Sequence, residues 1–148
     1  MSDLISRESD YAIRIIAYIA GVNRQVKIAE LTENLFITKP IVTKITQQLK
    51  KCGILITKTG KNGGLTLIEK IDDISLHQIL KCMGFKSAIN ICTVKPSECK
   101  LNPICDITTF FAEIQQDFIK KLKQAKIKDF VFSEKEIIEL KSINNRRL

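Results

Sequence analysis

Three cysteines lie close together in the second half of the chain, Cys92, Cys99 and Cys105, with the spacing C-x6-C-x5-C. Pro96 and Pro103 interrupt this segment, which is therefore predicted to form a loop. Thiolates are soft donors that suit iron–sulfur clusters and zinc. Because the five cysteines are odd in number and no secretory signal is recognisable, a metal centre is favoured over a fully paired disulfide framework.

The spacing alone leaves zinc and an iron–sulfur cluster as equal alternatives. Either centre normally takes four ligands, so three cysteines require a further donor. The other two cysteines, Cys52 and Cys82, fall in apolar helical patterns. We interpret them as small buried hydrophobic residues rather than as reactive thiols.

The charge of the chain is strongly positive. It has 24 Lys and Arg residues against 16 Asp and Glu residues, a formal charge of +8, which favours a polyanionic partner. Residues 35–67 contain six lysines and no acidic residue, which favours nucleic acid in particular. No stretch approaches the ~20 apolar residues needed to cross a bilayer, so we expect a cytoplasmic protein with no membrane association.

The first 70 residues contain the elements that position this basic segment. Ser6 is a predicted N-cap for a helix ending near Gly21, and apolar spacing indicates a short second helix from residue 28 to 35. Thr38 is the predicted cap of a third helix that runs to residue 52 and stops at Gly53. Runs of β-formers at 54–57 and 65–68, joined by a glycine-rich segment, predict a hairpin.

This order of elements predicts a winged helix-turn-helix, in which the third helix enters the major groove of DNA. Val42, Ile45 and Leu49 share its apolar face, so the opposite face is left to solvent. Lysines can reach phosphates or guanine, whereas threonine and glutamine can hydrogen-bond to base edges. The candidate DNA-binding residues are Lys39, Pro40, Thr43, Lys44 and Gln47 in the helix, and Lys58, Lys61 and Asn62 in the wing.

The second half of the chain contains two further helical stripes. One covers residues 76–83, and a longer, phenylalanine-rich one covers residues 107–125, directly after the cysteines. A helix of about twenty residues with such a seam favours a symmetric dimer, with packing inside one subunit as the alternative. Ser133 and Glu136 form a capping-box signature for a last short helix, and residues 144–148 are predicted to be a polar tail.

The predicted fold is therefore mainly α with a small β wing. Residues 1–70 form the winged helix-turn-helix domain, 71–91 a connecting helix, and 92–105 the cluster-binding loop. Residues 106–148 supply the dimerisation helix and a short C-terminal helix.

Several motifs, taken in order, resemble the Rrf-two family of bacterial winged-helix regulators. They are Asp10-Tyr11-Ala12-Ile13-Arg14, Thr38-Lys39-Pro40, Leu49 to Gly53, Gly60-Lys61-Asn62-Gly63-Gly64 and the three cysteines. The resemblance implies a homodimer that binds an inverted-repeat operator in double-stranded DNA. It also implies a four-iron or two-iron cluster in each subunit, which makes zinc the less favoured metal.

The sequence departs from the family pattern at two positions. Thr59 replaces an arginine that usually precedes the first wing glycine, which weakens the expectation of minor-groove reading by the wing. Thr108 stands where one branch of the family has a histidine that completes its two-iron cluster. The fourth ligand must therefore come from elsewhere.

Asp10 is the preferred fourth ligand. It matches an acidic residue that the nitric-oxide-sensitive branch of the family uses as an oxygen ligand from the partner subunit. An aspartate in the first turn of a helix also complements the helix dipole, so a purely structural role stays open. Glu8, Asp106 and the single histidine, His77, are the competing candidates.

These features predict a transcriptional regulator, not an enzyme, whose DNA affinity responds to redox state, nitric oxide or iron–sulfur status. The alternative is a small iron–sulfur or zinc redox protein, either an electron carrier or a thiol oxidoreductase, without a DNA role. Thiol catalysis has little support because no C-x-x-C pair is present. A family member that uses zinc or bare thiols as its switch is a third possibility.

Overall fold

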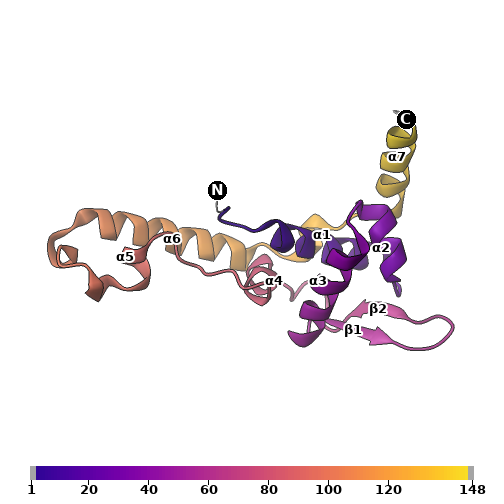
Figure 1. Ribbon diagram of the computed structural model, residues 1–148, viewed down its shortest axis with the longest axis horizontal. Coiled ribbons are helices and arrows are strands. Elements are labelled where there is room, and N and C mark those ends of the chain that lie inside the picture. The colour runs from indigo at the N-terminus through magenta and orange to yellow at the C-terminus, as the bar shows by residue number, and fades with distance from the viewer. Residues whose placement is uncertain (1–2, 147–148) are drawn as a thin grey trace.

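The computed structural model describes residues 3–146. The helices are α1 (Arg7–Val22), α2 (Ile28–Leu35), α3 (Lys39–Lys51), α4 (Leu76–Cys82), α5 (Ile91–Val94), α6 (Asp106–Gln124) and α7 (Glu134–Asn145). The strands are β1 (Leu55–Lys58) and β2 (Gly64–Leu67), and the 3-10 helices are η1 (Pro96–Glu98), η2 (Asn102–Ile104) and η3 (Ile127–Phe130). Figure 1 shows a head formed by α1 to α4 and the hairpin, from which α6 extends as an arm. The mainly helical fold with a small β wing is confirmed.

Helix α1 runs through the centre of the head. Its predicted N-cap is confirmed, because the Ser6 hydroxyl accepts a hydrogen bond from the backbone N–H of Ser9 at 3.2 Å. Ile15, Ile16 and Tyr18 are almost completely buried in the core. These apolar contacts, rather than helix propensity, account for most of the stability of α1.

Helices α2 and α3 form the predicted helix-turn-helix. Phe36 adopts the left-handed conformation, with φ of 56°, and this turns the chain into α3. Thr38 is the N-cap of α3, although its side chain makes no capping hydrogen bond. Gly53, with φ of 74°, follows the C-cap residue Cys52 and ends the helix as predicted.

The hairpin has the predicted position with a shift of one residue in each strand. The antiparallel register pairs Leu55 with Leu67 and Lys58 with Gly64. Val26 extends this small sheet, because its N–H and C=O both hydrogen-bond to Leu65. A single bridging residue of this kind has no periodic pattern by which it could be predicted.

The segment after α6 returns to the head and packs across α1. Ile127 is completely buried, and its N–H donates to the carbonyl oxygen of Ile74 at 2.9 Å. The N–H of Phe132 donates to the carbonyl oxygen of Ala17 at 3.3 Å. A side chain at Gly21 would overlap the Phe132 carbonyl oxygen, so this contact requires glycine.

Some predicted segments differ in detail. The connecting segment 71–91 is helical only in α4 and at its last residue, and the cysteine segment contains α5, η1 and η2 instead of a plain loop. The Ser133–Glu136 capping box is confirmed by their reciprocal hydrogen bonds. Helix α7 continues to Asn145, so the predicted polar tail from residue 144 was wrong there, while 147–148 lie outside the described residues. Within residues 3–146, no helix is long and apolar enough to span a membrane.

Candidate DNA-binding surface and cysteine site

The outer face of α3 presents the polar side chains predicted for DNA contact. Lys39, Pro40, Lys44 and Gln47 are exposed, and Thr43 is half-buried. On the opposite face, the side chains of Val42, Ile45 and Leu49 have no exposed surface. Burial of this stripe therefore fixes which side of α3 faces solvent.

Lys44 is exposed but paired. Its Nζ lies 2.7 Å from Oε1 of Glu8 in α1, and the two side chains are 67% and 43% exposed. Sequence reasoning missed this pair because 36 residues separate the partners. A DNA phosphate near Lys44 would compete with Glu8 for the ammonium group.

The wing presents the other predicted DNA-binding residues. Lys58 is the last residue of β1, and Lys61 and Asn62 lie in the turn that joins the strands. All three side chains are exposed. The basic residues of α3 and the wing thus belong to consecutive elements of the head, as a winged-helix DNA surface requires.

The three cysteines of the predicted metal site lie on three short elements. Cys92 is in α5, Cys99 follows η1 as its C-cap, and Cys105 is the N-cap of α6. All three are half-buried and none forms a disulfide. Among the described residues, no three His, Cys, Asp or Glu side chains converge as metal ligands do, so the structure places these thiols in one segment without gathering them.

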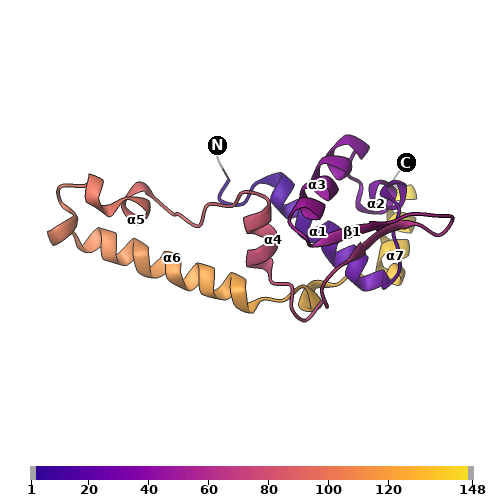
Figure 2. The ribbon, with the colours of Figure 1, turned by 90° about the horizontal axis from the view of Figure 1, so that it is seen from below.

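Local hydrogen bonds hold the cysteine segment against α6. The Asn90 side chain caps α5 by accepting from the N–H of Thr93 at 3.1 Å. The N–H of Ile89 donates to the Gln115 side chain of α6 at 3.0 Å. Figure 2 shows the chain between α4 and α5 running away from the head, in the direction opposite to α6.

The surroundings of Cys105 favour ionisation of its thiol. The backbone N–H groups of Thr108 and Ile107 in the first turn of α6 lower the pKa of this thiol, and the Thr108 hydroxyl adds to the effect. The Thr108 hydroxyl is buried, and apart from this contact with Cys105 it has no hydrogen-bond partner among the described residues. The Cys105 thiolate is a soft donor, which fits an iron–sulfur cluster or zinc.

The candidate fourth ligands are spread over the molecule. Asp10 pairs with Arg14 at 2.9 Å and is 47% exposed, and Glu8 is occupied by Lys44. Figures 1 and 2 both place α1, the helix that carries Asp10, away from α5, the helix that carries Cys92. Asp106 is exposed directly after Cys105.

His77 is half-buried in α4. Its burial lowers the pKa of the imidazole, and the nearby Lys123 and Lys81 lower it further. Its position in the head, rather than in the cysteine segment, favours a packing role.

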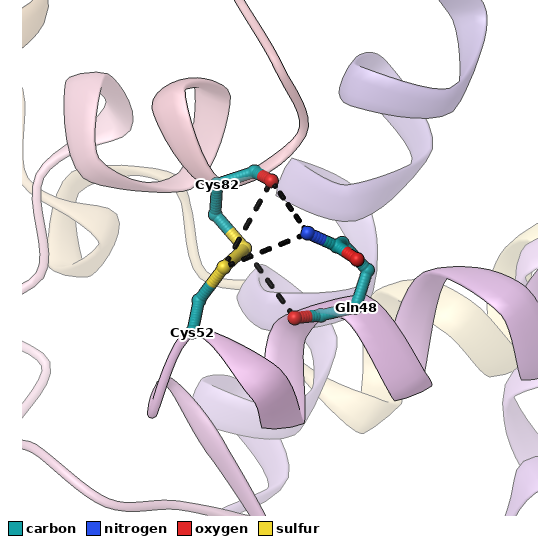
Figure 3. The surroundings of a disulfide bond; sticks show 3 residues. All are labelled: Gln48, Cys52 and Cys82. Atoms are coloured by element: carbon teal, nitrogen blue, oxygen red, sulfur yellow. Dashed lines mark hydrogen bonds between the residues drawn. A yellow bond between two sulfur atoms is a disulfide. The ribbon is translucent and has the colours of Figure 1, made fainter.

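The interpretation of Cys52 and Cys82 as small buried residues was wrong. They form a disulfide that links the ends of α3 and α4, with 6.0 Å between their Cα atoms (Figure 3). Cys52 is exposed and Cys82 is half-buried. Apolar periodicity could not reveal the pair, since it depends on how α3 and α4 pack, but the odd cysteine count is consistent with one pair beside three ligands.

The apolar seam of α6, the stripe of apolar side chains along residues 107–125, is packed at one end and exposed at the other. Near its end, Leu122 is buried and Phe118 packs edge-on against Phe85, with 6.1 Å between ring centroids. Near its start, Ile107 and Phe110 are 64% and 58% exposed. Packing inside one subunit therefore covers only the part of the seam near the head.

Comparison with known proteins identifies the family of the chain. A family model described as Rrf2, Iron-dependent Transcriptional regulator, matches residues 5–133. The HTH-type transcriptional regulator NsrR of Shouchella clausii is 25% identical over 132 residues, which cover 87% of this chain and 89% of that protein.

Solved structures of two regulators share the fold. CymR (YrzC), the global cysteine regulator of B. subtilis, has a TM-score of 0.74 at 14% identity, covering 87% of this chain and 95% of CymR. IscR of T. potens has a TM-score of 0.67 at 15% identity, covering 84% of this chain and 83% of IscR. With the family model extending from the start of α1 to the start of α7, this chain belongs to the Rrf2 family of DNA-binding transcriptional regulators.

Proposed function

We propose that this regulator is a homodimer whose affinity for an inverted-repeat operator is set by an iron–sulfur cluster bound to Cys92, Cys99 and Cys105. It acts in the cytoplasm, where its DNA is found. The iron-dependent description of the family model supports an iron centre. Thiolates from three neighbouring turns supply the soft donors that such a cluster prefers.

The proposal depends chiefly on the observation that α6 connects the cysteine segment to the head. The helix begins at Cys105 as its N-cap, and its other end packs against α4 in the DNA-binding head. One rigid element of 19 residues thus connects the cysteine segment to the head. A rearrangement of the segment shifts the start of α6, and through α4 it changes how the head is held.

The residues around the cysteines would hold the cluster in distinct ways. The helix N–H groups that favour the Cys105 thiolate, together with the Thr108 hydroxyl, would stabilise negative charge on sulfur. Asp10 of the partner subunit would provide the fourth ligand after releasing Arg14. When bound, the cluster supplies an iron with an exchangeable oxygen ligand, sensitive to oxygen, nitric oxide or iron supply.

Two surfaces would serve the DNA-bound dimer. Lys39, Lys44 and Lys61 would contact phosphates, while Thr43 and Gln47 would read base edges. The exposed start of the α6 seam would meet the same surface of a second copy, because an apolar face of this kind is unfavourable in water. The two heads would then read half-sites a whole number of helical turns apart.

Metal analysis of anaerobically purified protein tests the site. We expect iron and acid-labile sulfide with visible absorption in the parent, and loss of all three signals in Cys92→Ser, Cys99→Ser and Cys105→Ser. Cys82→Ser is the matched control, since it removes a thiol outside the segment and should retain iron. Zinc without sulfide in the parent, or parental iron content in Cys99→Ser, would contradict the proposed ligands.

Chelator challenge tests the fourth ligand. We expect Asp10→Ala to keep its cluster but to lose iron faster than the parent, because three thiolate bonds remain and only the oxygen donor is removed. Asp106→Ala, which changes an exposed acid beside Cys105, should lose iron at the parental rate. Equal rates in the parent and Asp10→Ala would exclude Asp10 as a ligand.

A further inference from the structure

We propose that Cys52 and Cys82 are a reversible dithiol–disulfide pair that responds to hydroperoxides and controls the attachment of the DNA-reading helix α3 to α4. The proposal rests on the proposed function only for its effect on DNA. The pair itself lies outside the predicted cluster ligands, as Figures 1 and 2 place α5 at the opposite end of α6 from α4.

The cysteine pair connects the end of α3 to the end of α4. Cys52 is the C-cap of α3 and lies immediately between that helix and the turn into β1. Cys82 is the last residue of α4, which packs against α1 and α6. The disulfide therefore joins the turn between α3 and β1 to α4, the helix that packs against α6.

The pair is accessible to small oxidants and reductants. The Cys52 side chain is exposed and the Cys82 side chain is half-buried. Cys82 is partly buried and packs against the hydrophobic core, whereas Cys52 lies at the surface. Small oxidants and reductants therefore reach the bond from the side of Cys52.

The surroundings of the two sulfur atoms suit the disulfide and also the two thiols that form on reduction (Figure 3). Cys82 Sγ lies 3.5 Å from the Gln48 carbonyl oxygen, and Cys52 Sγ lies 3.8 Å from the Cys82 carbonyl oxygen. After reduction each thiol can donate weakly to the carbonyl it faces. The Gln48 side-chain Nε2 donates to the Cys82 carbonyl oxygen at 3.1 Å, so one contact between the helices does not depend on the disulfide.

The compartment makes a permanent bond unfavourable. A transcriptional regulator works where DNA is, and cytosolic thiol systems keep most cysteines reduced. Disulfides that form there are generally transient and serve in catalysis or redox sensing. We therefore expect the dithiol at rest and the disulfide after oxidative exposure.

The oxidation balances with a hydroperoxide as the named oxidant. The exposed Cys52 thiolate attacks the terminal peroxide oxygen, the O–O bond breaks, and a sulfenic acid and an alcohol, or water, are formed. The Cys82 thiol then attacks the sulfenic sulfur, and water leaves as the S–S bond forms. Two electrons pass from the thiols to the peroxide, and a cellular dithiol reverses the change by thiol–disulfide exchange.

The disulfide is expected to strengthen DNA binding. In the bonded form, α3 presents its candidate DNA-binding residues on one exposed face. Fixing that face before binding reduces the conformational entropy lost on contact with DNA. We expect oxidation to tighten binding by about threefold or more, and reduction to reverse the gain.

The experiment uses the full-length protein with its metal content as purified. It is treated with equimolar hydrogen peroxide while visible absorption reports any cluster loss, and then alkylated and digested without reductant. Mass spectrometry should detect a peptide joined through Cys52 and Cys82 only after oxidation, and thioredoxin should remove it. Cys52→Ser and Cys82→Ser are matched controls that keep all three cysteines of the predicted site.

DNA affinity and hydrogen exchange are measured on the same samples. Oxidation that leaves the visible absorption unchanged should tighten DNA binding in the parent and leave the affinity of both serine variants unchanged. Exchange in a peptide covering residues 46–54 should become slower on oxidation of the parent, because the disulfide restrains the end of α3.

Each contrary result has a separate meaning. A bond that is present before oxidation and resists thioredoxin, or oxidation that joins only other cysteines, overturns the reversible pair. A Cys52–Cys82 bond that leaves DNA affinity unchanged or weakened overturns its control of DNA binding, while the proposed regulator function stands. If neither redox state binds DNA, the proposed function fails. Unchanged hydrogen exchange in residues 46–54 would overturn the proposed restraint of α3.

Discussion

Lys44 of α3 and Glu8 of α1 form an ion pair between the two helices, with 2.7 Å between Nζ and Oε1. Both side chains are substantially exposed, at 67% and 43%. An exposed pair of this kind contributes only about 0–1 kcal/mol to stability. Its greater consequence is that the carboxylate occupies an ammonium group on the surface proposed to meet DNA.

Glu8→Gln should tighten DNA binding by roughly twofold to fivefold at low salt, because Lys44 becomes available to a phosphate without first losing its partner. Lys44→Ala should weaken binding and reduce the slope of log affinity against log salt by about one. Fluorescence anisotropy at several salt concentrations measures both effects. Glu33→Gln, which removes an exposed acid from α2, controls for the general change in charge; if it tightens binding equally, the specific pairing has no role.

Phe110→Glu should convert a dimer into a monomer. The Phe110 side chain is 58% exposed on the seam near the start of α6, where burial against a second copy would be lost and a charge introduced. Gln116→Glu is the control, because this exposed residue lies on another face of α6 and adds the same charge. Light scattering at micromolar concentration gives the mass. A monomeric parent, or a dimeric Phe110→Glu variant, would argue against this interface.

Gly21→Ala should destabilise the protein by about 1–3 kcal/mol, because the new methyl group overlaps the Phe132 carbonyl oxygen. In an unobstructed helix the same change would stabilise by about 0.5–1 kcal/mol, so the sign is diagnostic. Thermal unfolding should show a lower Tm than the parent. A higher Tm would mean that the segment after α6 does not pack on α1 in solution.

The Tyr18 phenol should ionise at an unusually high pH. Burial and the hydrogen bond from its hydroxyl to Glu30 raise the pKa of Tyr18 from its ordinary value of 10.0 to about 12. A raised pKa in the folded state means that this stabilisation is complete below about pH 10 and is lost as the pH rises through about 12. Absorbance at the phenolate band in a Tyr11→Phe background measures this midpoint. Glu30→Gln should lower it, and an unchanged midpoint would show that Glu30 has no influence.

Local signals in the sequence predicted most of the head. Ser6 and Gly53 mark helix boundaries through capping and backbone conformation, and the buried stripe of α3 follows from helical spacing. The exposure of Lys39 and Gln47 follows from the same periodicity, since the residues opposite a buried face must meet solvent. The hairpin differed by one residue because glycine-rich turns fix strand ends poorly.

Contacts between distant residues were not predictable in this way. The Cys52–Cys82 disulfide and the Lys44–Glu8 pair join residues 30 and 36 positions apart. Both depend on how helices pack, which helical periodicity does not encode. The role of Cys92, Cys99 and Cys105 as ligands stays a prediction, because it depends on a bound group that the amino-acid sequence does not contain.

Cluster occupancy is proposed to set the affinity of the protein for DNA. The direct measurement compares the affinity of one anaerobic preparation for its selected operator before and after removal of the cluster by a chelator, at constant salt. We predict a difference of about tenfold or more, within the usual range for coupled sites, because the start of α6 would be anchored in one state and released in the other. Equal affinity in the two states, with cluster loss verified by iron and sulfide content, would contradict the account.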